Sequence, residues 1–234
     1  MVPASPGLFI VGTDTGVGKT AVSVAVLRWL AGAGLRVGAY KPVATGIAAA
    51  DAPGGDPLLL WDAAGRPRSP QAVCPQVFST PISPPRSSQA EGRQVDDYLL
   101  RSGLDAWSGF DVVVVEGAGG LFSPLSAQTV GAELARDLQL PVVIVDAARR
   151  EGIGRTLCCV RAARSEGLRI AACVFSEVSA VTDDSDSQRR VARQTADDLA
   201  ELVPGVPVTI LWHNASSFDP PIDWWQIAVA GRGS

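Results

Sequence analysis

The segment from Gly12 to Thr20, GTDTGVGKT, constrains this chain more than any other feature of its sequence. It stands between an apolar run, Leu8–Val11, and a stretch typical of a helix, Lys19–Ala33. Glycines between a strand and a helix let successive backbone N–H groups converge on phosphate oxygens, and the positive end of the helix dipole adds to this attraction. The segment therefore predicts a phosphate-binding loop.

This loop also supplies side chains that suit nucleotide chemistry. Lys19 would span the β- and γ-phosphates, and the Thr20 hydroxyl would bind Mg²⁺. One residue departs from the general pattern, because Thr13 stands where that pattern has a glycine five positions before Gly18. The residues predicted to bind the nucleotide phosphates are Gly16, Val17, Gly18, Lys19 and Thr20.

Short apolar runs bracketed by glycine, proline or aspartate recur along the chain and predict buried strands. They are Leu8–Val11, Val37–Tyr40, Val112–Val115, Val142–Val145, Ile170–Phe175 and, more weakly, Val206–Leu211. The stretches typical of helices are Lys19–Ala33, Pro57–Ala64, Val95–Ser108, Val130–Leu138, Arg155–Glu166 and Ser185–Leu202. This alternation predicts an α/β fold of the P-loop NTPase type, with a doubly wound, mainly parallel sheet and helices on both faces. At 234 residues, we expect one nucleotide-binding domain over residues 1–234.

Two regions break this alternation. Residues 65–93 contain six prolines, which predicts either an ordered loop over the ligand-bearing edge of the sheet or a linker. Residues 212–234 contain three of the six tryptophans, two adjacent prolines and a polar end. That composition predicts an irregular C-terminal tail packed on the surface.

Composition excludes several classes of protein. A net charge of −4 disfavours nucleic-acid binding through a basic face, and no apolar run approaches the ~20 residues of a membrane span. The N-terminal sequence has no basic segment before an apolar one, so we expect no signal peptide and a cytoplasmic protein. Four cysteines without a CxxC pair, and a single histidine, His213, argue against a zinc site, a disulfide framework and a Ser-His-Asp or Cys-His enzyme.

Acidic residues at strand and helix ends are candidates for a metal site. Glu116 ends an apolar run and precedes GAGG, and a carboxylate there faces the ligand crevice of an α/β sheet. Its charge is costly to bury without a cation, so we expect it to bind Mg²⁺. Asp56 precedes a short helix and would either bind the metal or cap that helix. Asp146 ends the next strand and is either a further ligand or a structural cap.

Lys41 follows the second predicted strand and begins the segment KPVATG at 41–46. A lysine at the carboxyl end of a strand, on a turn stiffened by proline, would point into the same crevice as the phosphate loop. There it would neutralise charge on a γ-phosphate during its transfer. The alternative is a solvated lysine beside a turn.

Taken together, these segments resemble the dethiobiotin synthetase family. The matching segments, in the family's order through the first half of the chain, are GTDTGVGKT at 12–20, KPVATG at 41–46, Asp56, PISP at 81–84, EGR at 91–93, VEGAGG at 115–120 and Pro124. The resemblance implies an ATP-dependent cyclo-ligase of biotin biosynthesis, which closes the ureido ring of dethiobiotin from 7,8-diaminopelargonic acid, CO₂ or bicarbonate, and ATP. It also implies a homodimer whose substrate lies near the subunit interface.

The same resemblance implies roles for individual residues. Lys19 and Lys41 would be catalytic and would stabilise the phosphoryl and carbamate oxygens. The magnesium ligands would be Thr20, Asp56 and Glu116. Nucleotide contacts outside the loop would come from Asp56, Glu116, Gly117, Ala118, Gly119 and Ser176. The substrate would be bordered by Thr15, Lys41, Thr45 and Gly120.

The second half of the chain departs from the family. Ser176 stands where the family has an asparagine that reads adenine, and a serine cannot pair bidentately with a base. This departure predicts weak discrimination among nucleotide bases. Where the family has a segment that helps to hold the substrate carboxylate, this chain has Arg149, Arg150 and Arg155. These arginines either bind that carboxylate or are surface charges.

Other functions are compatible with parts of this sequence. A paralogue that kept the phosphate site but changed its substrate would fit the divergent second half. A nucleotide-dependent switch or partitioning ATPase usually has a lysine near the start of the loop, where Asp14 and Thr15 stand here. A cobyrinate amidase-type ligase would need a glutaminase nucleophile, and the sequence has no recognisable arrangement of one.

Overall fold

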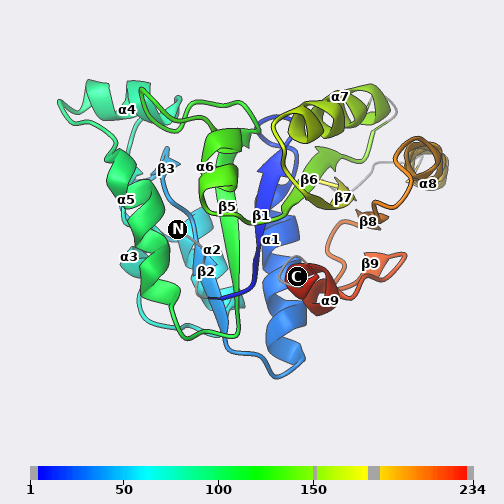
Figure 1. Cartoon of the computed structure of the whole chain (residues 1–234), viewed down its shortest axis with the longest axis horizontal. Helices are drawn as coiled ribbons and strands as arrows, with labels where there is room; N and C mark the ends of the chain where they lie inside the picture. Colours follow the sequence, from blue (N-terminus) through cyan, green and yellow to red (C-terminus); the bar gives the residue numbers. More distant parts are fainter. Residues whose placement is uncertain (1–4, 150–151, 179–184, 231–234) are drawn as a thin grey trace.

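A central parallel sheet organises the computed structural model, which describes residues 5–149, 152–178 and 185–230. The strands of this sheet are β1 (Gly7–Gly12), β2 (Val37–Tyr40), β5 (Val112–Gly120), β6 (Val142–Ala147), β7 (Ile170–Ser176), β8 (Val208–Leu211) and β9 (Phe218–Asp219). Their order across the sheet is β2–β5–β1–β6–β7–β8–β9 (Figure 1). All neighbours pair in parallel except β8 and β9, so the predicted mainly parallel α/β sheet is confirmed.

Helices flank this sheet, as the alternation of strands and helices predicts (Figure 1). One group consists of α1 (Lys19–Gly32), α2 (Asp56–Ala63) and α9 (Trp224–Val229), which pack on one another around α1. A second group consists of α6 (Gly131–Asp137) on β5, α7 (Gly152–Ser165) on β6 and β7, and α8 (Ser185–Leu202) on β8. Within the described ranges, no helix combines the length and apolar character needed to cross a bilayer.

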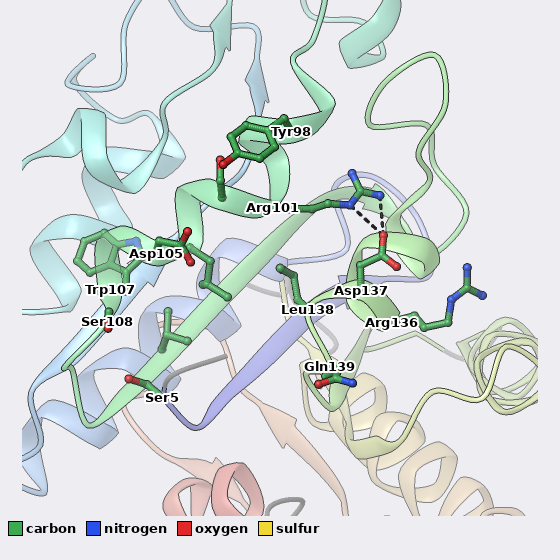
Figure 2. A pocket seen from close by; sticks show the side chains of 13 residues that line it. Ser5, Tyr98, Arg101, Asp105, Trp107, Ser108, Arg136, Asp137, Leu138 and Gln139 are labelled. Atoms are coloured by element: carbon green, nitrogen blue, oxygen red, sulfur yellow. Dashed lines mark hydrogen bonds and ion pairs between the residues drawn. The ribbon is translucent and has the colours of Figure 1, made fainter. Parts of the chain in front are cut away.

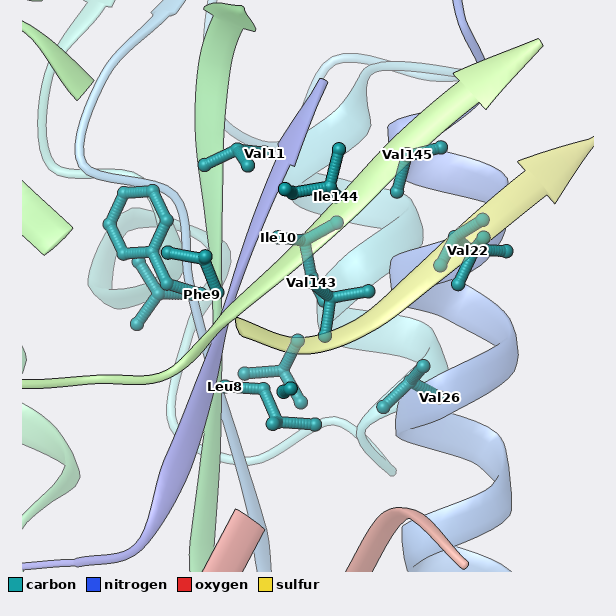
Figure 3. Packing of buried hydrophobic residues seen from close by; sticks show 14 of the residues in the cluster. Leu8, Phe9, Ile10, Val11, Val22, Val26, Val143, Ile144 and Val145 are labelled. Atoms are coloured by element: carbon teal, nitrogen blue, oxygen red, sulfur yellow. The ribbon is translucent and has the colours of Figure 1, made fainter. Parts of the chain in front are cut away.

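Successive side chains of β1 point to opposite faces of the sheet and contribute to the core on both sides (Figure 3). Every residue of this strand is buried. Leu8 and Ile10 point to the side on which α1 carries Val22 and Val26, whereas Phe9 points to the other side (Figure 3). Because both faces are covered, a strand here is apolar throughout rather than at every second residue. This burial fixes the position of the loop that follows β1.

One predicted helix is wrong in its extent. The segment Val95–Ser108 forms a short helix, α5 (Asp97–Ser102), followed by a 3₁₀ helix at Gly103–Trp107. The cause is Tyr40, whose hydroxyl donates to the carbonyls of Leu99 and Leu100 at 2.8 and 3.1 Å. A Cβ at Gly103 would collide with the same hydroxyl. The buried tyrosine therefore draws this segment against β2 and changes its helical geometry.

The proline-rich region 65–93 is an ordered loop rather than a linker. It contains three short elements, α3 (Pro70–Val73), β4 (Val77–Phe78) and α4 (Pro84–Ala90). Strand β4 pairs in parallel with β3 (Ala44–Thr45), which lies shortly after β2 in the chain. This two-stranded sheet holds the loop beside the carboxyl end of the main sheet.

The predicted irregular tail at 212–234 is instead partly regular, with the two-residue strand β9 and helix α9. The side chain of Trp224 is fully buried, and its ring meets Phe218 edge-on with centroids 4.8 Å apart. Asp223 begins the helix by accepting a hydrogen bond from the backbone N–H of Gln226 at 2.9 Å. Burial of this aromatic pair explains why the segment forms regular structure. Residues 231–234 lie outside the described residues.

This packing predicts that Trp224→Ala destabilises the domain. Removing a fully buried aromatic side chain costs ~3–5 kcal/mol, because its contacts are lost and a cavity remains. The matched control is Gln226→Ala in the same helix, where the side chain is exposed. Urea unfolding followed by circular dichroism measures both variants. Equal midpoints for the two variants would contradict the structural role of the tail.

Candidate active site

The predicted phosphate loop joins β1 to α1 and is tied to the sheet at its base. The N–H of Thr13 donates to the carbonyl of Val145 at 2.9 Å, and the N–H of Leu121 donates to the carbonyl of Gly12 at 3.2 Å. Gly18 caps α1 with φ at +93°, in the left-handed region that favours glycine. Thr13 has no positive φ, so the loop does not need the glycine that the general pattern has there.

Lys19 is the first residue of α1, and its side chain turns back into the loop. Its Nζ donates to the carbonyl of Asp14 at 3.0 Å, and the residue is buried. Burial lowers the pKa of Lys19, although the negative charges of Glu116 and Asp56 oppose this effect. The ammonium therefore lies where the loop would enclose a phosphate.

Lys41 and Glu116 meet because their strands are neighbours in register. Tyr40 at the end of β2 pairs with Val115 of β5, so the residue after each lies at the same edge of the sheet. Lys41 Nζ donates to Glu116 Oε1 at 2.5 Å, and both side chains are buried. Strand β5 continues to Gly120, so Glu116 lies within the strand rather than at its end.

Asp56 and Thr20 complete this cluster from two helices. Asp56 is the first residue of α2, and its Oδ2 accepts a hydrogen bond from Lys41 Nζ at 2.5 Å. Thr20 Oγ1 lies 3.0 Å from Asp56 Oδ1 and 3.1 Å from Glu116 Oε1. Gly55 rather than Asp56 is the cap residue of α2, so the predicted alternative of a capping role is wrong.

Electrostatics hold Lys41 and Asp56 in their charged forms. Burial by itself would lower the pKa of Lys41, but the charges of Glu116 and Asp56 outweigh it and raise that pKa. Burial would likewise raise the pKa of Asp56, but the nearby Lys41 lowers it. With Lys19 included, the positive charges of two ammonium groups balance the negative charges of two carboxylates around the mouth of the loop.

This donor set suits a magnesium ion. Magnesium takes oxygen ligands in octahedral geometry and is usually held by one or two carboxylates with water and phosphate oxygens. Thr20 supplies a hydroxyl oxygen, and Asp56 and Glu116 supply carboxylate oxygens. The second oxygen of Glu116, Oε2, is buried and has no hydrogen-bond partner in the described part of the chain. A buried carboxylate oxygen without a partner is costly, and a cation would satisfy it.

A cleft of about 760 Å³ opens over the loop. Most of the residues predicted from the sequence line it: Thr15, Gly16, Gly18, Lys19, Thr20, Lys41, Thr45, Asp56, Gly117, Ala118 and Gly119. Four predicted residues do not line it: Val17, Glu116, Gly120 and Ser176. Val17 packs in the hydrophobic core. Glu116 does not line the cleft itself, but it contacts two residues that do, Thr20 and Lys41.

Several lining residues were not assigned a role from the sequence. The far wall comes from the proline-rich loop, from Pro81 to Pro84, where Ile82 is half exposed. Ile47 and Ser123 also line the cleft. Ser123 Oγ accepts a hydrogen bond from the N–H of Gly120 at 2.8 Å, which folds the end of β5 beside the loop. An isolated serine carries no motif, so pattern alone could not have found it.

Ser176 lies behind the loop rather than in the cleft. It is the last residue of β7 and is buried, and its Oγ has no partner among the described residues. A Cβ placed on Gly18 would collide with that hydroxyl group. The serine therefore packs against the backbone of the phosphate loop.

The third acidic candidate, Asp146, is held by residues of α7. Its carboxylate accepts hydrogen bonds from Arg155 at 2.9 and 3.2 Å, from Thr156 at 3.3 Å and from the N–H of Ala147 at 2.8 Å. It is fully buried and does not line the cleft, which favours the structural alternative. Arg149 is exposed, and Arg150 lies outside the described residues. The backbone N–H of His213 donates to Glu177 at 2.9 Å, away from this cluster.

A second cavity, of about 740 Å³, lies toward the amino ends of β1 and β5 (Figure 2). Its walls include Ser5, Tyr98 and Trp107, and Arg101 reaches Asp137 there with hydrogen bonds of 2.9 and 2.6 Å. It shares no lining residue with the cleft over the phosphate loop. The predicted site residues therefore gather at the opposite, carboxyl edge of the sheet.

Solved structures share the fold of this chain. The signal recognition particle receptor FtsY from Elizabethkingia anophelis is 15% identical, with a TM-score of 0.55 over 97% of this chain and 65% of that one. Chloroplast FtsY from Physcomitrella patens is 18% identical, with a TM-score of 0.51 over 98% of this chain and 65% of that one. This chain thus spans about two thirds of their length, and at such identity the likeness concerns the P-loop NTPase fold alone.

Comparison of sequences finds relatives of higher identity than these solved structures. A family model described as an AAA domain matches residues 6–209. The ATP-dependent dethiobiotin synthetase of Rhodopirellula baltica is 39% identical over 191 residues, which cover 76% of this chain and 75% of the relative. That of Anaeromyxobacter dehalogenans strain 2CP-C is 37% identical over 204 residues, 86% of this chain and 91% of the relative. The synthetase of Bacillus licheniformis is 32% identical over 206 residues, which cover 86% of this chain and 83% of the relative. The chain therefore belongs to the ATP-dependent dethiobiotin synthetase family.

Proposed function

We propose that this protein is an ATP-dependent dethiobiotin synthetase, which closes a ureido ring on 7,8-diaminopelargonic acid with CO₂ and ATP. The observation that carries the proposal is the cluster in which Lys41 joins Asp56 and Glu116 beside the phosphate loop. Relatives that bear this name match over most of the chain and support the same conclusion. The family resemblance of the segments at 12–20, 41–46 and 115–120 points the same way.

The reaction needs positioning and charge stabilisation more than covalent catalysis. One amine of the substrate adds to CO₂ and loses a proton, which gives a carbamate. A carbamate oxygen attacks the γ-phosphorus of ATP and releases ADP, which leaves a mixed carbamic–phosphoric anhydride. The second amine attacks the carbonyl carbon, loses a proton and expels phosphate as the ring closes. Negative charge develops on oxygen in each step, so fixed cations nearby lower the barriers.

The two lysines are placed to supply those cations. Lys19 lies inside the loop that would hold the phosphates, and Lys41 lies across the cleft at the end of β2. We assign both to stabilising the phosphoryl group in transfer and assign Lys41 to the carbamate as well. Thr20, Asp56 and Glu116 would hold Mg²⁺, which when bound offsets the phosphate charge.

The substrate would lie between the loop and the proline-rich wall. Thr15 and Thr45 line this part of the cleft with hydroxyl groups, and Ile82 adds an apolar side chain that suits an alkyl chain. The resemblance also supports a homodimer. Arg149, Arg150 and Arg155 either bind the substrate carboxylate or are surface charges, and Arg155 already pairs with Asp146. A cytoplasmic enzyme is consistent with the four cysteines, which are all free thiols.

The proposed function is tested by assaying the purified protein with ATP, Mg²⁺, bicarbonate and 7,8-diaminopelargonic acid. We expect phosphate release and formation of dethiobiotin, detected by mass spectrometry, in equal amounts. Phosphate release that needs no diamine would indicate a switch ATPase. A nucleotide site that yields no dethiobiotin would indicate a paralogue with another substrate.

Loss of either lysine should abolish turnover. Lys19→Ala and Lys41→Ala each remove a cation from the transferring phosphoryl group, so we expect kcat to fall by at least ~10²–10³. Lys41→Ala also leaves buried Glu116 without its ion partner and should cost stability of ~3–5 kcal/mol. Lys41→Arg is the charge-preserving control for folding. Near-normal kcat in Lys41→Ala would remove Lys41 from the mechanism.

Neutral replacements of the carboxylates should remove metal dependence. Glu116→Gln and Asp56→Asn keep the shape of each side chain, but an amide oxygen is a poorer ligand for a hard cation. We expect loss of Mg²⁺-dependent activity, measured as kcat/KM for the Mg–nucleotide complex. Asp146→Asn, at the end of the next strand but outside the cleft, is the matched control. Wild-type metal dependence in Glu116→Gln would show that the metal lies elsewhere.

Base selectivity should be weak. No residue lining the described cleft carries an amide side chain, Ser176 packs behind Gly18, and the only asparagine of the chain is Asn214. Without paired hydrogen bonds to a base, a site discriminates poorly. We expect kcat/KM for ATP, GTP and CTP to agree within about tenfold, or ~1.4 kcal/mol. A preference above ~100-fold for ATP would mean that backbone groups or residues near Trp212 read the base.

A further inference from the structure

The Lys41 ammonium occupies the centre of the proposed metal site. Its Nζ lies 2.5 Å from Asp56 Oδ2 and 2.5 Å from Glu116 Oε1, and the residue is 5% exposed. The lysine is thus an internal cation held by the same acids that would ligate the metal.

The ammonium contacts the same two carboxylates that would ligate the metal. Glu116 Oε1 accepts from Lys41 and also lies 3.1 Å from Thr20 Oγ1, whereas Asp56 offers a different oxygen to each neighbour. A metal ion bound to Thr20, Asp56 and Glu116, for instance through Glu116 Oε2, which has no partner among the described residues, would therefore share both carboxylates with the ammonium. Two cations on the same pair of carboxylates, one of them fully buried, repel each other strongly.

We propose that Lys41 makes this site selective for a metal–nucleotide complex over the free metal ion. The metal ion and the ammonium compete for the negative charge of Asp56 and Glu116, and the nucleotide phosphates supply further negative charge that the ammonium would contact instead. This inference rests on the metal site proposed above.

The charge balance of the site supports the proposal. Lys19 and Lys41 already neutralise Asp56 and Glu116, so a free divalent ion would leave two positive charges in excess in a mostly buried cluster. A polyphosphate that enters with the metal removes that excess. Free metal should therefore bind weakly, and nucleotide should strengthen metal binding well beyond simple chelation.

The choice of lysine also fits a group that must move. Only two of the 20 basic residues are lysines, Lys19 and Lys41, and the other 18 are arginines. An arginine would grip a carboxylate with two parallel hydrogen bonds, whereas an ammonium on a flexible four-carbon stem forms a compact contact that can turn to a new partner. Both lysines of the chain lie in this one site.

The first test measures Mn²⁺ binding by electron paramagnetic resonance, without nucleotide, in the wild type and in Lys41→Met and Lys41→Gln. We expect both variants to bind free Mn²⁺ at least tenfold more tightly than the wild type. Arg36→Met is the control, because it removes a cation from an exposed pair with Asp111 far from the cluster. The double variant Lys41→Met/Glu116→Gln should lose the gained binding. Affinity in the Lys41 variants equal to or below that of the wild type overturns the proposal.

The second test needs no variant that might fail to fold. In wild-type protein labelled with ¹⁵N-lysine, only two side-chain ammonium groups can give signals, and Lys19→Arg assigns them. We expect the Lys41 signal to stay in place with millimolar Mg²⁺ alone and to shift when a non-hydrolysable ATP analogue is added with Mg²⁺. A shift that saturates with micromolar Mg²⁺ alone overturns the proposal.

The two tests separate this inference from the proposed metal site. If no protein binds Mn²⁺ even with the nucleotide analogue, then the metal site and the inference both fail. If the wild type binds Mn²⁺ with the analogue but the Lys41 variants gain nothing without it, then only the inference about Lys41 fails.

Discussion

The arrangement of strands and helices around the site depends on the ion cluster of Lys41, Glu116 and Asp56. Glu116 is fully buried in a sheet, where an isolated carboxylate would be prohibitively costly, and Lys41 offsets that cost at 2.5 Å. The pairing requires β2 and β5 to be neighbours in register, and it places Asp56 and Thr20 around the same point. The phosphate loop supplies an electropositive partner across the cleft, so an electrically balanced site lies at the carboxyl edge of the sheet.

Much of this architecture could be predicted from sequence because its determinants are local. Apolar runs such as Val142–Val145 are buried on both faces and form strands where predicted. The loop at 12–20 is set by glycines and by its position between a strand and a helix, which are read directly from the chain. Glu116 and Lys41 follow apolar runs, and parallel pairing brings such positions to one edge.

Other features depend on contacts between residues far apart in sequence. The break between α5 and the 3₁₀ helix comes from the hydroxyl of Tyr40, which no periodicity within 95–108 reveals. Helix α9 exists because Trp224 is buried against Phe218, whereas its composition alone predicts a tail. Asp146 resembles Glu116 in sequence context, yet Arg155 from α7 holds it away from the cleft. The direct contact of Lys41 with both carboxylates also emerges only in three dimensions.

We propose that these charges serve transfer of a phosphoryl group to a carbamate oxygen rather than to water. The most direct measurement follows ¹⁸O from labelled bicarbonate during turnover with 7,8-diaminopelargonic acid and ATP, with mass spectrometry of both products. We expect one ¹⁸O atom in the released phosphate and one in the ureido carbonyl of dethiobiotin. Phosphate that carries no label from bicarbonate, but takes up ¹⁸O from labelled water instead, would contradict this proposal.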